Sequence, residues 1–452
     1  MAVDIRPDRS AGAARGPGVY VEHRWREAGH QDAPRTAIPA FIGFGACRGV
    51  ASAADPGCRL VQRREQFDGL FEGMPDRAYL GHALRGFFDN GGRRCVVVPA
   101  GVGARNPAAM AAALAAPLRP GGVLEDLDEI DLVCAPDLMM LAQGGASAAV
   151  LEVQGVVLEH CRRMGNRFAI LDALPGEEAA AAAAAAGSAA TERRVETALR
   201  QWDALAAEAG ALYFPWVCVE TTRHALDATA HPEDGAATLS MPPCGHIAGV
   251  FARTDERAGP HQAPANELLH GVVRLDPDID DGQFAALNDK GVNCLRSVPG
   301  RGIRLYGART LSGQPGWRYV NVRRLFLSLA RWVEHGCADL VFDSNDARLW
   351  ERIEQRLRGY CQALLDAGAL AGRTPAEAFH VKCDAETNPR EVAAAGMVVA
   401  EVGLAPLAPA EFIVVRITQH AGGAAVGIPA DGRALSRADI RADIRAGIRA
   451  VI

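Results

Sequence analysis

Short runs of almost wholly apolar residues, alternating with helical patterns, constrain the fold of this chain more than any other feature. The runs that predict strands are Ala37–Gly45, Cys95–Ala100, Asp131–Ala135, Arg167–Asp172, Ala211–Val219 and Val292–Val298. Between them, apolar residues recur at helical spacing over about 65–88, 107–116, 146–164 and 190–209. Strands that are apolar throughout are typical of a parallel sheet that is covered on both faces. Residues 36–300 are therefore predicted to form a mostly parallel, doubly wound α/β sheet domain.

After residue 300 the pattern of apolar residues changes from alternating strands and helices to two helices followed by strands, which predicts a second, smaller domain. Apolar periodicity indicates two amphipathic helices, Arg318–Glu334, ended by Gly336, and Ala347–Asp366. Three candidate strands follow, at Phe379–Cys383, Met397–Leu404 and Glu411–Thr418. Two shorter pieces, His246–Phe251 and Asp339–Phe342, also have strand-like sequences. Residues 301–420 are thus expected to form an α+β C-terminal domain.

Both ends of the chain are expected to be extended arms. Residues 1–35 are polar and charged, with one apolar alternation at Val19-Tyr20-Val21. Residues 421–452 form the C-terminal arm or tail, and from Ala434 the unit Arg-Ala-Asp-Ile is repeated. The repeat aligns Ile440, Ile444 and Ile448 along one side of a helix. A helix with so narrow an apolar stripe is marginally stable alone and is expected to become ordered only against a partner surface. The alanine run at 179–186 indicates a solvated insertion.

Charge and cysteine usage exclude several classes of protein. The formal net charge is −6 over 452 residues, so no basic field draws the chain to nucleic acid. The 11 cysteines are scattered without a CxxC pair, which argues against a zinc ribbon or thioredoxin-like motif and fits a reducing cytoplasm. No apolar stretch has the length of a membrane span, and the N-terminus lacks a signal peptide's apolar core, so no direct membrane insertion is expected.

The sequence motifs of known catalytic and ligand-binding sites identify no catalytic, cofactor-binding or metal-binding residues in this chain. Phosphate-loop, zinc-protease and hydrolase-elbow motifs are absent. Gly43-Phe44-Gly45 is the nearest approach to a dinucleotide loop, but it lacks the third glycine. Cys244 and His246 have no second pair of ligands, and the acidic cluster Asp276, Asp278, Asp280 and Asp281 is explained by capping of a helix at 282–289. Trp317, Trp332 and Trp350 are expected to pack in the C-terminal domain.

Several stretches, in order, resemble the tail sheath proteins of contractile phages and of related phage-tail-like injection systems. These stretches are Pro17–Glu22, Thr36–Gly43, Phe87–Val98, Met241–Asp255 with Ala263–Asn266, Tyr306–Ser312, Trp317–Arg324, and Glu401–Phe412 leading into Ile413–Gln419. The resemblance covers about residues 17–420. The chain departs from the family pattern in its alanine run, which replaces a proline-rich segment, and in its long repeated tail.

The resemblance implies a structural subunit without enzymatic activity. Such subunits polymerise as stacked hexameric rings around an inner tube and contract to drive the tube through a target envelope. The implied partners are other copies of the chain, the inner tube protein, and the baseplate and tail terminator or cap proteins. Assembly is expected in the bacterial cytoplasm, as part of a phage tail or of a phage-tail-like particle that is released or anchored.

The resemblance also implies two sets of contact residues. Terminal arms would each add a strand to a neighbour's sheet, and alternating residues suited to this are Val19, Tyr20, Val21, Phe412, Ile413, Val414, Val415 and Ile417. One C-terminal helix would face the tube. Candidate tube-facing residues are Arg348, Arg352, Arg356 and Arg358 on the second helix and Arg323, Arg324 and Arg331 on the first.

Two other functions remain open at the level of sequence. An α/β enzyme or small-molecule-binding protein would use the doubly wound domain, and its ligand would raise the melting temperature. A binding module that never polymerises would stay a monomer or small oligomer at high concentration.

Overall fold

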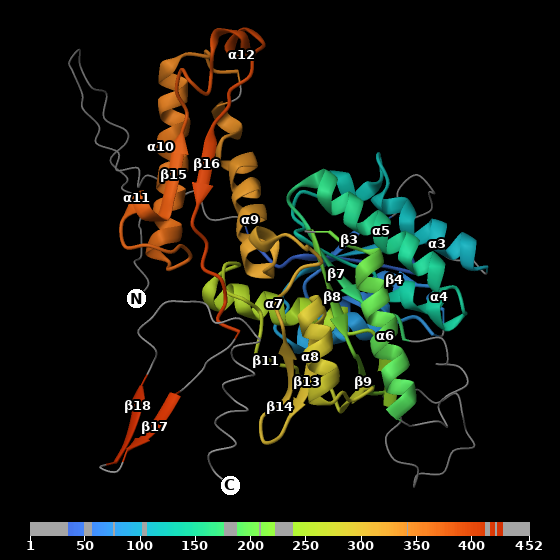
Figure 1. Cartoon of the computed structure of the whole chain (residues 1–452). Coiled ribbons are helices and arrows are strands. Elements are labelled where there is room, and N and C mark those ends of the chain that lie inside the picture. Colours follow the sequence, from blue (N-terminus) through green and yellow to red (C-terminus); the bar gives the residue numbers. More distant parts are fainter. Residues whose placement is uncertain are drawn as a thin grey trace, which may run out of the picture.

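A nine-stranded mixed sheet forms the centre of the molecule (Figure 1). The computed structural model describes residues 35–48, 57–75, 77–101, 106–175, 188–207, 209–221, 238–340, 342–411, 416–420 and 423–427. Six central strands are parallel and lie in the order β13 (Asn293–Val298), β8 (Gly210–Phe214), β7 (Phe168–Asp172), β6 (Leu132–Cys134), β1 (Pro39–Gly43) and β5 (Cys95–Pro99). Antiparallel strands complete both sides: β14 (Gly302–Tyr306) and β11 (Glu267–Leu268) on one, β3 (Arg59–Val61) on the other.

The parallel strands are where the apolar runs predicted them. Every residue of β1, β5, β6, β7 and β8 is buried. Such strands gain most of their stability by removing apolar side chains from water. The prediction of a mixed α/β fold with a large, mostly parallel sheet is therefore confirmed.

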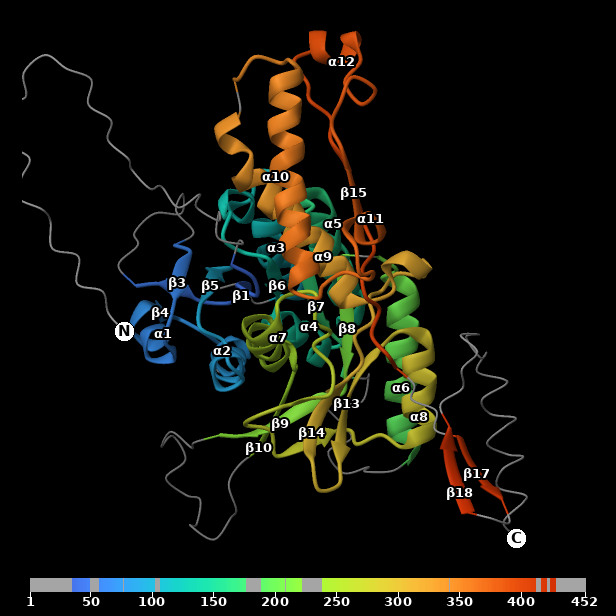
Figure 2. The same ribbon diagram turned by 90° about the vertical axis from the view of Figure 1, so that its left-hand side faces the viewer.

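Helices in two groups pack on this sheet (Figure 2). In the first group, α2 (Leu80–Asp89) and α7 (Cys244–Ala258) pack closely on each other and on the central strands. In the second, α5 (Ser147–Met164) packs on β7 and carries α3 (Pro107–Ala115) and α4 (Met139–Gln143). Two further helices, α6 (Ser188–Ala204) and α8 (Asp281–Lys290), pack on each other, and α8 contacts β13. The Asp280 side chain accepts the Gln283 N–H at 2.8 Å, so the predicted cap of α8 is confirmed.

Two of the predicted elements are each divided in two. The helix expected over 65–88 is α1 (Arg64–Leu70) and α2, separated by the short strand β4 (Phe71–Glu72), which pairs with β2 (Ala46–Cys47). The strand expected over Ala211–Val219 is β8 and β9 (Trp216–Glu220), separated by Pro215. Beyond this proline, β9 leaves the large sheet and pairs with β10 (Thr238–Met241) and β12 (Arg274–Asp276).

The strand-like sequence His246–Phe251 is wrong as a strand prediction, because these residues lie in helix α7. All eight residues from Cys244 to Phe251 are buried. A helix that is buried on every side has no polar face, so its apolar run cannot be distinguished from that of a buried strand.

The C-terminal elements project from the sheet body and have a hydrophobic core of their own (Figure 1). They are α9 (Val320–Gly336), α10 (Ala347–Asp366), α11 (Pro375–Ala378), β15 (Phe379–Lys382), α12 (Arg390–Ala394) and β16 (Glu401–Leu404). Trp332 of α9 stacks on Tyr360 of α10, with ring centroids 4.5 Å apart. The two amphipathic helices are thus confirmed, and Trp332 packs as expected.

Three smaller details differ from or add to the prediction for this part. Asp339–Phe342 is not a strand: Ala338–Leu340 forms one turn of 3-10 helix. The strands β15 and β16 pair antiparallel. The last predicted strand appears as β17 (Arg416–His420), which pairs with β18 (Gly423–Gly427) as a hairpin.

Candidate functional site

A buried ion-pair cluster joins helix α9 to the sheet body. The Arg324 guanidinium donates to both carboxylate oxygens of Asp255 in α7, at 2.7 and 2.5 Å. It also lies 3.5 Å from Asp131, at the head of β6, and Arg331 approaches the same carboxylate at 3.7 Å. The side chains of Arg324 and Asp255 are each only 3% exposed. Because a bidentate pair between planar groups fixes both partners, α9 is held in one orientation on the body.

The same cluster holds the entry of the chain into the sheet. Asp131 accepts the backbone N–H groups of Ala37 and Ile38, at 2.8 and 2.6 Å. Ala37 has φ 57°, in the left-handed region that side chains rarely adopt. The chain therefore bends sharply just before β1, and the carboxylate that holds this bend is the one that faces the arginines of α9.

Burial and charge act in opposite directions on this cluster. Burial by itself would lower the pKa of Arg324, but the neighbouring Asp255 and Asp131 carboxylates outweigh it and raise that pKa. The guanidinium also lies over the Phe251 ring, 4.9 Å from its centroid. Arg324 therefore keeps its charge. Burial raises the pKa of Asp131, and the neighbouring Arg324 and Arg331 guanidiniums oppose that rise.

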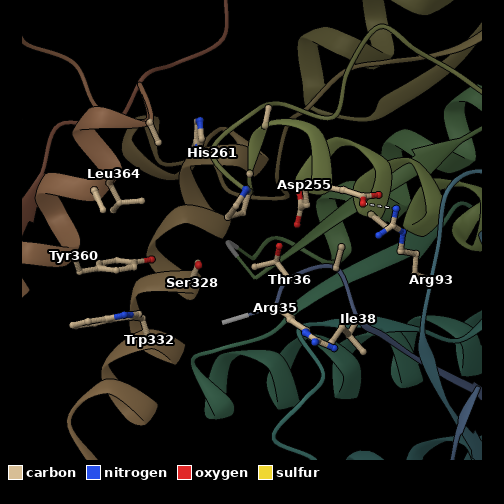
Figure 3. A pocket seen from close by; sticks show the side chains of 18 of the residues that line it. Arg35, Thr36, Ile38, Arg93, Asp255, His261, Ser328, Trp332, Tyr360 and Leu364 are labelled. Carbon is tan, nitrogen blue, oxygen red and sulfur yellow. Dashed lines mark ion pairs between the residues drawn. The ribbon is translucent and has the colours of Figure 1, made fainter. Parts of the chain in front are cut away.

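A groove lies between the sheet body and the α9–α10 pair (Figure 3). Its volume is about 1120 Å³. Trp332, Tyr360 and Leu364 form one wall, and Asp255 and Arg93 lie on the opposite side. Arg35 and Thr36, the first described residues of the chain, also line it.

The small sheet β15–β16 leaves two strand edges without a further strand in the described part of the chain. Phe379 and Val381 of β15 point into the C-terminal core, whereas His380 is exposed. Edges of this kind present unpaired backbone groups to which another chain can add a strand.

The residues expected to exchange strands fall largely outside the described residues. Those that do are Val19, Tyr20, Val21, Phe412, Ile413, Val414 and Val415. Ile417 lies in β17, opposite Val426 of β18.

The arginines expected to face the tube divide into two groups. Arg348, Arg352 and Arg358 of α10 are exposed, and Arg356 is half-buried. Surface carboxylates pair with three of them: Asp343 with Arg352, Asp339 with Arg356 and Glu354 with Arg358. On α9, Arg323 is half-buried with its guanidinium 4.9 Å from the Trp317 ring centroid.

The expectation that Arg324 and Arg331 could face the tube is wrong for this subunit, because both side chains are buried, at 3% exposure. Their partners Asp255 and Asp131 come from distant parts of the chain. Sequence reasoning missed these two carboxylates. The available signal was Asp131 itself, a charged residue at the head of an apolar run.

The chemical sites that the sequence analysis considered have structural roles here. The N–H of Cys244 donates to Asp172 at 2.8 Å in the first turn of α7, and His246 packs against Gly86 of α2. Burial raises the pKa of Asp172 to about 7 and lowers that of His246 to about 4. Within the described ranges, no three His, Cys, Asp or Glu side chains gather as metal ligands. In those same ranges, no helix has the length and apolar character needed to cross a membrane.

Comparison with protein families gives two consecutive matches. The model of the phage tail sheath protein central domain matches residues 123–311, and that of the phage tail sheath C-terminal domain matches residues 312–420. The tail sheath protein of Vibrio phage KVP40 is 29% identical over 177 residues, 38% of this chain and 26% of that protein. That of Burkholderia phage BcepMu is 29% identical over 162 residues, 33% of this chain and 32% of that protein. The chain spans less than half the length of the curated relatives that it matches.

Solved structures cover more of the chain. The helical sheath of the anti-feeding prophage (AFP) in its contracted state is 28% identical, with a TM-score of 0.65, over 90% of this chain and 100% of that chain. The sheath complex of an extracellular contractile injection system (PVC), also contracted, has the same fold with a TM-score of 0.63 at 24% identity. The two family matches run without a break from residue 123 to residue 420, and on that ground the chain belongs to the phage tail sheath protein family.

Proposed function

We propose that this chain is the sheath subunit of a contractile particle. It polymerises as stacked hexameric rings around an inner tube and contracts to drive the tube through a target envelope. The observation that carries the proposal is the likeness to the contracted AFP sheath over 90% of this chain and the whole of that one. A structural role also agrees with the buried, capped or ion-paired state of the polar residues considered above.

Strand exchange is the proposed link between subunits. The N-terminal arm, residues 1–35, and the segment containing Phe412–Ile417 would each add a strand to a neighbour's β15–β16 sheet. Among the described residues no further strand covers either edge of that sheet, which supports this proposal. Backbone hydrogen bonds would then keep subunits connected while their bodies rotate and slide.

The proposed subunit has a doubly wound sheath domain at 36–300 and an assembly domain at 301–420, between the terminal arms 1–35 and 421–452. Two separate hydrophobic cores support this division, one built on the large sheet and one on α9, α10 and β15. The bidentate Arg324–Asp255 pair spans the proposed boundary, so the two domains would move together.

The tube contact is proposed for the exposed face of α10. With Arg324 and Arg331 in the interior, the remaining arginines are Arg323, Arg348, Arg352, Arg356 and Arg358. Surface ion pairs contribute only about 0–1 kcal/mol each, which suits a contact with an acidic tube that must release during contraction.

Contraction of the sheath would need no nucleotide hydrolysis. The sheath assembles in an extended, metastable form, and contraction buries more surface between subunits, so the energy is stored in two packings of one sequence. The proposed partners are further copies of the chain, the inner tube protein, and baseplate and terminator proteins. Assembly would take place in the bacterial cytoplasm, with the particle remaining a phage tail or being released or anchored as a tail-like particle.

Negative-stain electron microscopy of the purified chain, alone and co-expressed with a tube protein encoded beside it, tests the proposal. Hollow six-fold cylinders of two lengths and diameters are expected. Uniform small particles under all conditions would contradict it, and a ligand-dependent rise in melting temperature would then favour the enzyme hypothesis.

A further inference from the structure

The groove between the sheet body and the α9–α10 pair is open in the described part of the chain, and the chain itself runs into it. Arg35, Thr36, Ala37 and Ile38 all line the groove. Figure 3 shows Arg35 and Thr36 between the wall of Trp332 and Tyr360 and the side of Asp255 and Arg93. Residue 34 is therefore joined directly to a residue that already lies in the groove.

The direction of entry is fixed by the body. Asp131 holds the N–H groups of Ala37 and Ile38, and the left-handed backbone at Ala37 turns residues 35 and 36 away from the axis of β1. Asp131 in turn faces the buried Arg324 and Arg331 of α9, so the carboxylate that holds this bend is itself held by α9.

The α10 wall has room for a backbone. Gly359, Ala363 and Ala367 line the groove at intervals of four residues, on one face of the helix. Two turns of helix extend about 12 Å, whereas the seven residues 28–34 reach up to about 25 Å when extended. The segment before Arg35 is long enough to follow this stripe completely.

Charge distinguishes among the possible occupants. Four arginines, the arginine rim, line the groove: Arg35, Arg93, Arg94 and Arg356. Three of them form surface ion pairs, Arg93 with Glu256, Arg94 with Glu129 and Arg356 with Asp339, and such pairs are weak enough to exchange partners. Asp255, also in the lining, is paired with the buried Arg324. Residues 27–34, Glu-Ala-Gly-His-Gln-Asp-Ala-Pro, contain two carboxylates and no Lys or Arg. The repeated tail has four arginines and two aspartates between residues 437 and 449, so the same rim would repel it.

We propose that residues 27–34 of the same chain dock in this groove, with small residues against the Gly359–Ala367 face and Glu27 and Asp32 toward the arginine rim. The N-terminal arm would then leave each subunit from the end of the groove in a defined direction. That consequence rests on the proposed exchange of arms, but the docking itself requires only a single folded subunit.

Site-specific photocrosslinking of the full-length protein tests the docking. A benzophenone amino acid replaces the exposed Ala363 in the groove or, as control, the exposed Gln355, which is on the same helix but does not line the groove. Subunits labelled with ¹⁴N and ¹⁵N are mixed before irradiation, and crosslinked peptides are sequenced by mass spectrometry. We expect Ala363 to crosslink within residues 27–34 of its own chain, with little reaction from Gln355.

Charge variants test whether residues 27–34 bind the groove or only lie near it because they are joined to Arg35. Glu27→Arg with Asp32→Arg is expected to lower the crosslink yield about five-fold, because two ion pairs become repulsive while the tether is unchanged. The matched control, Asp4→Arg with Asp8→Arg, changes the same charge outside the segment and should leave the yield as it was.

Three outcomes would overturn the inference. They are crosslinks to residues 434–452, crosslinks to a chain of the other isotope, and a yield from residues 27–34 that the first charge variant does not lower. If docking is confirmed but cylinders never form, the groove contact stands and the sheath proposal fails, so the two are tested separately.

Discussion

At the scale of single residues, the Arg324–Asp255 pair is the contact whose loss should cost most. Arg324→Met leaves Asp255 buried without its partner, and an uncompensated buried charge costs about 3–5 kcal/mol. We expect urea unfolding followed by tryptophan fluorescence to show a loss of this size in the free energy of unfolding.

Two variants control that measurement. Arg348→Met, at an exposed position of α10, should change the free energy of unfolding by less than about 0.5 kcal/mol. Arg324→Met combined with Asp255→Leu should recover part of the loss, since no charge is then left unpaired between the two positions. A single Arg324→Met variant as stable as the wild type would show that the pair does not hold α9 on the body.

Two buried carboxyls make stability depend on pH. Burial raises the pKa of Asp172 to about 7 and that of Asp137 to about 6, above the value near 4 of an unfolded chain. The folded state thus binds more protons than the unfolded state between about pH 4 and 7. Their stabilising contribution is complete below the unfolded pKa and is lost as pH rises through the folded values. We expect these groups to make the free energy of unfolding increase as pH falls from 8 toward 5.5.

Asp172→Asn isolates one of these groups. The amide oxygen can still accept the Cys244 N–H but carries no charge, so the variant's free energy of unfolding should depend less on pH between 6 and 8. Denaturant titrations at several pH values measure this, with the exposed Asp278→Asn as control. Equal pH dependence in the wild type and the Asp172 variant would contradict the assignment.

At the scale of elements, the α2–α7 contact depends on glycines of α7. A Cβ at Gly245 would lie 2.1 Å from the Ala83 carbonyl oxygen, and one at Gly249 would lie 2.5 Å from that of Phe87. The two helix backbones therefore approach too closely for any side chain. Gly245→Ala should lower the free energy of unfolding by about 3 kcal/mol or more, because both backbones would have to move apart.

The matched control lies in another helix. Gly155 is in the middle of α5, and nothing lies within 4 Å of a Cβ built there. Gly155→Ala should stabilise the protein by about 0.5–1 kcal/mol through helix propensity alone. Differential scanning calorimetry should give a lower melting temperature for Gly245→Ala and a higher one for Gly155→Ala. An unchanged or higher melting temperature for Gly245→Ala would show that α2 and α7 do not pack this tightly.

At the scale of the whole molecule, the arms should be needed for assembly but not for folding. Deleting residues 1–22 removes Val19–Val21 and leaves the described cores intact, so a folded, soluble subunit that cannot form long sheaths is expected. Circular dichroism measures folding, and electron microscopy measures sheath length.

A point variant sharpens this test. Tyr20→Pro removes one backbone donor from the alternating segment and should shorten sheaths, whereas Ala13→Pro, outside that segment, should not. Sheaths of wild-type length from the truncated chain would contradict the proposed exchange of arms.

The sequence by itself determined the central strands and most of the helices. Residues such as Phe41 and Val97 are apolar because a parallel strand is buried on both faces, and that requirement is visible in the local run. Helix α10 begins and ends where its apolar face predicted, and Asp280 caps α8 through a neighbour three residues away. Features decided by residues close together in the chain could be predicted.

Only the tertiary structure decided the remainder. His246–Phe251 lies in a helix that packs on α2 and on the sheet, and because these residues are all buried, their own sequence did not distinguish the helix from a buried strand. Arg324 was assigned to a surface, yet it is buried beside Asp131, 193 positions away. The free energy of a buried charge depends on partners brought together by folding, so the interior cluster and the groove beside it follow from the packing of distant elements.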